Sequence, residues 1–522
     1  MKISKIATIV ASTFILFAAG QTFAENKSSV ERYLDKTHAQ YRKGNITAKT
    51  FWNRLSKVEQ KLKGLPKDKK IRTLLMQSNL LYENEYYILA SIYAAQAIKV
   101  ADDPIGKETQ KAWKIISRVS QKQPIKEVVE ILAADLNLAK TPPFLGRNWL
   151  YYKANHLADS GKIDEAIQIY DQIQIKDRYF LSAKYQQALL FVQKGDLDSA
   201  RIKLKTMLYP TSYEVSPLPE SQKSEIRNFA YLALGRLAYE EKSFANSINA
   251  YRMVDRKSPV YYDALFEQSW AMFMAGYPLH ALGSLHSVES PFYENVFNPE
   301  APLLRSMIYY WLCRYDDGKD ALADFTEKYS ASVEKLDKFL SRKRLTSQTS
   351  YQLFEDMVSG VSSESLGIPR MILETAAEKD DMLQIRDQYA SVIEEYQRLE
   401  SQGLYGSTNY TNKPKEYLKK WAVHLQRRLG KKFLVELEGM KVTFDRLYNQ
   451  AQFLYLELMM SEKDKLLGKN LHASSKITKV KDSENIIGWG NKTQRWDIDE
   501  NKEYWWDEVG FYISKKPSLC SE

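Results

Sequence analysis

Few residues of this 522-residue chain are spaced for catalysis or metal binding. The six histidines are dispersed, and the closest two, His280 and His286, are six residues apart, which does not place both on one helical face as a zinc site requires. The sequence contains no Gly-rich phosphate loop, no Gly-x-Ser-x-Gly elbow and no His-Glu-x-x-His helix. We therefore expect no catalytic residue, metal or cofactor, and an enzyme such as a cell-wall hydrolase is the least favoured class.

The strongest pattern for a metal is an acidic run near the carboxyl end. Its residues fit positions 1, 3, 5, 7 and 12 of a calcium-binding loop: Asp497, Asp499, Asn501, Glu503 and Glu508. Position 6, where the loop needs Gly for a sharp turn, is Lys502 instead, and two tryptophans lie inside the loop. A solvated acidic tail is therefore the preferred interpretation.

The composition and the amino end indicate an exported helical protein. Gly and Pro number only 21 and 16, and this scarcity favours helices over sheets with many tight turns. Lys2 and Lys5 precede an apolar run that ends at Gly20, and Thr22 and Ala24 are small residues suited to a cleavage site. We expect a signal peptide over residues 1–24, cleaved after Ala24, and a periplasmic mature chain without a transmembrane segment. An uncleaved anchor is the alternative.

A repeat of 34 residues organises the middle of the chain. Three of the four clear units have a Gly that turns the chain between two helices, and all four have a small residue that lets the helices approach and a bulky residue that fills the space toward the next unit. The clear units contain Gly161, Ala166 and Tyr170; Gly195, Ala200 and Leu204; Phe244, Ser247 and Tyr251; and Gly276, Ala281 and Leu285. Weaker units are expected over Leu74–Ala97, over Pro104–Ala139 and around Tyr315, Gly318 and Leu322.

This pattern resembles the tetratricopeptide repeat (TPR) over residues 70–328. The resemblance implies an all-α superhelical solenoid of about six to seven repeats, preceded by a helical segment over 25–69. In TPR proteins the first helix of each pair lines a concave groove that holds a peptide or another subunit. The groove offsets then select Asn148, Tyr151, Asn155, Tyr185, Arg236, Tyr239, Trp270 and Phe273. Leu189 and Phe266 also have groove offsets, and a place in the core between repeats is the alternative for both.

Longer helices are expected after residue 328, where the 34-residue period stops. Apolar residues alternate three and four apart from Met382 to Leu399 and from Phe433 to Leu458, on either side of a Gly-rich stretch that ends at Pro414. The spacing predicts a coiled-coil-like antiparallel hairpin over 366–468 within a helical region 329–468, and an ordinary helical domain is the alternative. Residues 469–522 form a Trp-rich tail, which packs in cis or binds a partner in trans.

Two cysteines, Cys313 and Cys520, are the only ones in the chain. Because the expected compartment is oxidising and the end of a TPR array needs its apolar face covered, we favour a disulfide that ties the tail to the last repeat. A buried Cys313 with a free Cys520 is the alternative.

The net charge of +10 is concentrated between Lys413 and Asp482, where 16 basic residues face 8 acidic ones. A solvated helix face or contact with an anionic envelope surface explains this excess, and nucleic acid is not expected outside the cytoplasm.

The whole layout resembles periplasmic TPR proteins of bacterial envelope and gliding-motility machines, a resemblance prompted by Tyr310–Tyr315 and Trp496–Tyr512. It implies a non-catalytic scaffold that binds protein partners in the cell envelope. An outer-membrane biogenesis or chaperone-like factor is the alternative.

Overall fold

The computed structural model describes residues 27–123, 125–136, 142, 144–342, 345–378, 380–401, 412–468, 496–498 and 503–520. Over these ranges the chain is all-α, as the sequence predicts, apart from the short parallel strands β1 (Trp496–Asp497) and β2 (Tyr512–Ile513). The predicted signal peptide and Trp489 lie outside the described residues. None of the described helices combines the length and the apolar character needed to cross a lipid bilayer.

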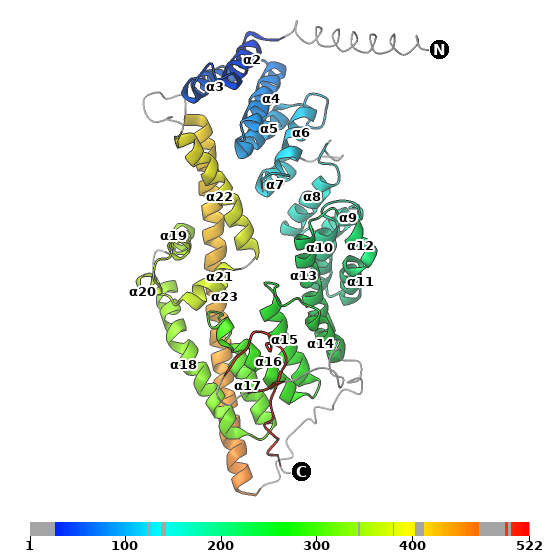
Figure 1. The fold of residues 1–522 in the computed structure, drawn as a ribbon, viewed down its shortest axis with the longest axis vertical. Coiled ribbons are helices and arrows are strands. Elements are labelled where there is room, and N and C mark those ends of the chain that lie inside the picture. Colours follow the sequence, from blue (N-terminus) through cyan, green and yellow to red (C-terminus); the bar gives the residue numbers. More distant parts are fainter. Residues whose placement is uncertain are drawn as a thin grey trace, which may run out of the picture. The chain divides into compact units, whose positions relative to one another are not determined.

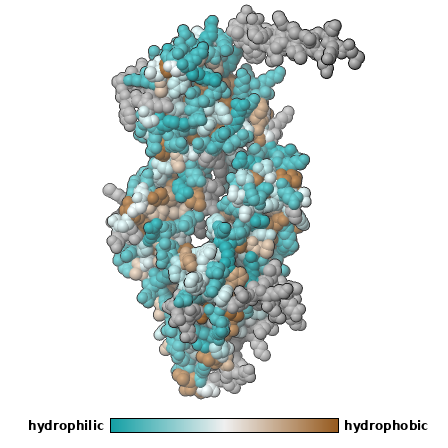
Figure 2. All heavy atoms as spheres, in the orientation of Figure 1, coloured by the Kyte–Doolittle hydropathy of each residue, from teal (hydrophilic) through white to brown (hydrophobic). Residues whose placement is uncertain are grey.

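The chain forms two compact units, each with its own core. The first contains the residues up to Ile169 together with Ile385–Leu425, and the second contains Tyr170–Gln384 and the chain from Gln426 on. Helix α23 (Asn412–Leu466) contributes its start to the first unit and its remainder to the second. The visible surface is mostly hydrophilic and is interrupted by hydrophobic side chains (Figure 2).

The first unit is built mainly from consecutive helices joined by short turns (Figure 1). They are α2 (Ser29–Arg42), α3 (Ala48–Leu62), α4 (Lys67–Glu83), α5 (Tyr87–Val100), α6 (Gln110–Val119), α7 (Lys126–Asp135), α8 (Asn148–Asp159) and α9 (Ile163–Asp171), whose last two residues belong to the second unit. Most of α22 (Asp380–Ser401) joins them.

The second unit continues with helices of the same kind. These are α10 (Phe180–Gln193), α11 (Leu197–Leu208), α12 (Pro210–Val215), α13 (Glu220–Glu240), α14 (Phe244–Arg252), α15 (Tyr261–Met274), α16 (Pro278–Val288), the 3-10 turn η1 (Pro291–Tyr293) and α17 (Glu300–Trp311). Then follow α18 (Tyr315–Leu340), α19 (Ser347–Val358), α20 (Ser363–Leu366) and α21 (Arg370–Ala377). Helix α18 runs through residue 328, so the end of the 34-residue period does not coincide with the end of a helix.

One local geometry recurs in six helix pairs of the described chain. A small residue on the first helix is followed seven residues later by a turn residue with positive φ and five residues further on by a small residue of the second helix. The six sets are Ser78, Glu85 and Ala90; Ala154, Gly161 and Ala166; Ala188, Gly195 and Ala200; Gly235, Lys242 and Ser247; Ser269, Gly276 and Ala281; and Ser306, Cys313 and Gly318.

The small residues bring the two helices of a pair into close contact. In three pairs a buried serine hydroxyl donates to a backbone carbonyl of the other helix: Ser78 to Ala90 (2.7 Å), Ser247 to Gly235 (2.8 Å) and Ser306 to Gly318 (2.8 Å). A larger side chain at these positions would push the helices apart. The regular spacing therefore fixes how each pair packs.

Residues 366–468 differ from a single long hairpin. Helix α22 has 22 residues and α23 has 55, and within the second unit the apolar seam of α23 packs on α18 and α19. The ring of Phe444 stacks on Phe325 of α18 with a centroid separation of 5.4 Å, and Phe433 meets Phe354 of α19 at 5.5 Å. Gly430 allows this approach, because a Cβ there would lie 1.8 Å from the carbonyl oxygen of Ser347.

A buried carboxylate ties α22 to the start of α5 in the first unit. Glu395 is 2% exposed and accepts hydrogen bonds from the backbone N–H groups of Ile88 (2.6 Å) and Leu89 (3.1 Å). Burial raises the pKa of Glu395 to about 7, although the two hydrogen bonds act in the opposite direction.

The stability of the first unit should therefore depend on pH through Glu395. Its pKa in the folded chain lies above the ordinary value of 4.5, so its contribution is complete below about pH 4.5 and is lost as pH rises through about 7. Urea unfolding should show a loss of about 3 kcal/mol from this group between pH 4.5 and 8. Glu395→Gln should flatten this part of the slope, and an unchanged slope in that variant would contradict the assignment.

Candidate partner-binding face and the docked tail

The predicted groove residues lie on first helices of successive pairs, as their offsets require. Asn148, Tyr151 and Asn155 lie on α8 in the first unit, where all three are half-buried. In the second unit Tyr185 lies on α10, Arg236 and Tyr239 lie on α13, and Trp270 and Phe273 lie on α15. The ring of Tyr185 contacts Phe229 of α13 at 6.1 Å, and Tyr239 contacts Phe244 of α14 at 5.5 Å.

Arg236 and Trp270 occupy equivalent positions, 34 residues apart, and each donates to an acid on the next first helix. The Arg236 guanidinium donates from Nε (3.0 and 2.9 Å) and Nη2 (2.6 Å) to the carboxylate of Glu267 on α15. The Trp270 indole donates to Glu300 Oε1 at the start of α17, 3.0 Å away. Burial raises the pKa of Glu300, while the bond from Trp270 lowers it.

These bonds join α13, α15 and α17 into one row. The groove offsets alone did not predict that Arg236 and Trp270 connect neighbouring helix pairs. The two acids follow their donors by 31 and 30 residues, so a search for a donor and an acid about one repeat apart could have found them. Arg236 stays half-exposed in its pair, with 53% of its side chain accessible. The row therefore keeps a polar and aromatic surface partly exposed.

The prediction that Phe273 is an exposed groove residue is wrong. It is 6% exposed and packs edge-on against Trp311 of α17, with ring centroids 6.4 Å apart. The offset places Phe273 on the first helix, but the next pair approaches closely enough to cover it. Leu189, for which a core position was the alternative, is exposed instead, and Phe266 is half-buried against the core.

The tail is docked on the second unit and is joined to it by a disulfide between Cys313 and Cys520, whose Cα atoms are 5.0 Å apart. Its backbone N–H groups donate at Gly510 to Ser287 Oγ (2.8 Å), at Ser514 to the carbonyl of Leu279 (3.1 Å) and at Leu519 to the carbonyl of Leu312 (2.8 Å). In the described residues the tail therefore packs in cis along α16 and the turn before α18.

A glycine on α16 gives the tail the room that it needs. A Cβ at Gly283 would lie 1.9 Å from the carbonyl oxygen of Tyr512 in β2, so any side chain there would displace the tail. The three tryptophans of the described part of the tail cover the second unit only partly, since Trp496, Trp505 and Trp506 are 43%, 60% and 46% exposed. Trp506 meets Phe292 at 5.3 Å.

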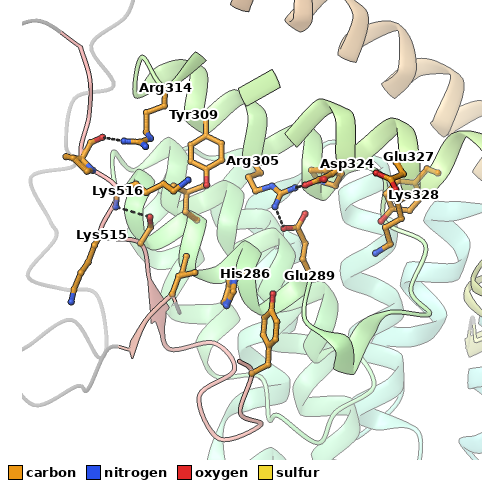
Figure 3. A pocket seen from close by; sticks show the side chains of 17 residues that line it. His286, Glu289, Arg305, Tyr309, Arg314, Asp324, Glu327, Lys328, Lys515 and Lys516 are labelled. Atoms are coloured by element: carbon orange, nitrogen blue, oxygen red, sulfur yellow. Dashed lines mark hydrogen bonds and ion pairs between the residues drawn. The ribbon is translucent and has the colours of Figure 1, made fainter. Parts of the chain in front are cut away.

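A cavity of about 1150 Å³ lies between the tail and helices α16, α17 and α18 (Figure 3). Arg305 lines this cavity and forms ion pairs with Glu289 (3.1 Å) and Asp324 (2.5 Å). Burial raises the pKa of Glu289, and Arg305 opposes this shift. On the tail side Lys516 pairs with Asp317. These ion pairs connect three helices and the tail, so the polar lining has a structural role.

Two further candidate patterns of the sequence lie in the tail and on α23. Over the described ranges no group of three or more His, Cys, Asp and Glu side chains could hold a metal ion. In the calcium-like pattern Asp499 and Asn501 lie outside the described residues, and Asp497 pairs with Lys515. In the basic segment Lys419, Lys420, Arg427 and Lys431 are exposed on α23.

Comparison with known proteins adds no relative to this description: no protein-family model matches the chain, and no curated protein matches it.

Proposed function

We propose that this chain is a non-catalytic periplasmic scaffold of the TPR type, which binds protein partners along the row of first helices within an envelope-associated assembly such as a motility complex. The observation that supports this best is the recurrence of one packing geometry in six helix pairs. Such pairs stack because a single pair cannot bury its apolar face, and stacking produces an extended surface suited to proteins and peptides.

The second unit offers side chains that suit a peptide. Trp270 is half-buried, and its indole N–H is oriented by Glu300, so its exposed edge is a rigid aromatic anchor of the kind that dominates many interfaces. Glu267 lies on the same helix as Trp270, and its ion pair with Arg236 of the preceding repeat places charged groups near the indole. An apolar anchor next to polar groups favours an extended segment that buries one aromatic or aliphatic side chain and bonds through its backbone.

We also propose that α22 and the start of α23 form the antiparallel hairpin, on a smaller scale than the sequence spacing suggests. An ion pair between Lys415 and Glu400, 3.9 Å apart, supports this pairing.

Trp270→Ala should abolish partner capture in co-purification from envelope fractions. Trp506→Ala is the matched control, because that tryptophan is also half-exposed and lies on the docked tail of the same unit. The helical circular dichroism signal should be unchanged in both variants. Loss of the helical signal together with binding in Trp270→Ala would make Trp270 a core residue, and loss of capture in Trp506→Ala would move the binding site to the tail.

The captured proteins also distinguish the functions. Motility or motor proteins support the proposal, barrel-assembly proteins support an outer-membrane biogenesis factor, and release of muropeptides would indicate a cell-wall enzyme.

A further inference from the structure

Helix α23 carries a second apolar face that is exposed in the described part of the chain. Its buried seam is the one that packs on α18 and α19, yet five large apolar residues on the same helix, and a sixth directly after its last residue, are 54–69% exposed. They are Val435, Val442, Phe453, Leu456, Met460 and Leu467. Figure 2 shows hydrophobic side chains at the end of the view where α23 finishes in Figure 1.

The exposed residues have the spacing of a coiled-coil seam. Steps of four and three residues lead from Val435 to Leu467, and the intervening seam positions are Gly439, Arg446, Asn449 and Lys463. At 100° per residue this seam lies on the side of the helix opposite Phe444, Leu447, Ala451 and Leu454, which are buried.

An apolar outer face is unusual at this place in the fold. Within the second unit α23 covers α18, the second helix of the last regular pair, with Leu458 against Gly318. A terminal element of a helical array normally shows a polar face to solvent, because an apolar one continues the stacking. Six of the ten positions on this seam are large apolar residues, and so many exposed apolar side chains on one helix face mark an interaction surface.

We propose that this face binds the same face of a second copy of the chain, with the two α23 helices antiparallel around a two-fold axis near residue 451. Antiparallel pairing places Val435 opposite Leu467 of the other copy, Val442 opposite Met460 and Asn449 opposite Phe453. The face is therefore complementary to itself, as a two-fold interface requires.

The charges select the antiparallel arrangement. A parallel pair in register would place Arg446 against Arg446 and Lys463 against Lys463 of the two copies, which is repulsive. In the antiparallel pair Arg446 lies opposite Leu456 and beside Glu457 of the other copy, and Lys463 lies opposite the small Gly439 and beside Glu438. Each cation on the seam therefore has an acidic residue of the other copy nearby, so these charges favour the antiparallel pair over the parallel one.

The test is the mass of the purified full chain in sedimentation equilibrium over a range of concentrations. We expect a monomer–dimer equilibrium, and Phe453→Asp should raise the dissociation constant at least about tenfold. Phe453 is exposed in the single chain, so this variant should keep the melting temperature of the wild-type monomer, measured at concentrations well below the dissociation constant. Ile202→Asp is the matched control, because Ile202 is 63% exposed on α11, away from the face, and its dissociation constant should not change.

A charge exchange tests the orientation. Glu438→Lys and Lys463→Glu should each weaken the dimer, and the double variant should recover it. A wild-type chain that stays monomeric at all concentrations overturns the proposal and leaves the face to another protein or to another part of its own chain. A dissociation constant that does not change in Phe453→Asp overturns the assigned face. A double variant that dimerises more weakly than both single variants overturns the antiparallel orientation.

Discussion

Replacing Leu447 by Asp should lower the free energy of unfolding of the second unit by about 2–5 kcal/mol. Leu447 is 2% exposed, in the seam where Phe444 stacks on Phe325 of α18. The substitution removes packed apolar volume and places a carboxylate at a buried position. Chemical denaturation followed by circular dichroism measures the change.

The control for this variant is Ile202→Asp, which introduces the same side chain at an exposed position and should alter stability by about 0.5 kcal/mol or less. A similar small change in Leu447→Asp would show that the seam is not packed.

Breaking the disulfide should have an effect of comparable size. Cys313 and Cys520 are 207 residues apart, and closing so long a loop restricts the unfolded chain by up to about 5 kcal/mol in the entropic treatment. Denatured chains that retain structure reduce this value. Cys520→Ser should therefore destabilise the second unit and release the end of the tail from the turn before α18, as measured by denaturation and by proteolysis of the tail.

Cys313→Gly provides an internal comparison. Cys313 is the turn residue of its helix pair and has a φ of 55°, a conformation that glycine adopts without strain. This variant loses the same disulfide but should be destabilised less than Cys520→Ser. Two free thiols in a non-reduced digest of the wild-type protein, measured by mass spectrometry, would contradict the link.

The helix pairs could be predicted where glycine marks the turn. Gly161 and Gly195 are 34 residues apart and give the register, and the structure places the same turn at Glu85, Lys242 and Cys313, with Lys242 34 residues before Gly276. Those residues carry no sequence signal for a left-handed conformation, and the small residues seven positions before and five after each of them would have been the better guide.

Contacts between elements could be predicted much less well. The spacing of Phe433 and Phe444 shows that one face of α23 is buried, but a heptad pattern does not say which helix covers it, and the structure gives α19 and α18. The groove offsets likewise put Phe273 on a first helix, and only the position of Trp311 decides that it is buried. The pairing of Cys313 with Cys520 was easier to anticipate, because two cysteines allow a single intrachain pair.

Partner binding along the row of first helices is tested most directly by a photo-crosslinking amino acid at Tyr239 of α13, used in cells. Tyr209 is the matched control, since it is also a tyrosine of the second unit and is 60% exposed between α11 and α12. We predict a discrete crosslinked protein from position 239 that disappears in the Trp270→Ala background, and none from position 209. The same products from both positions, or products that persist without Trp270, would contradict a partner-binding face on these helices.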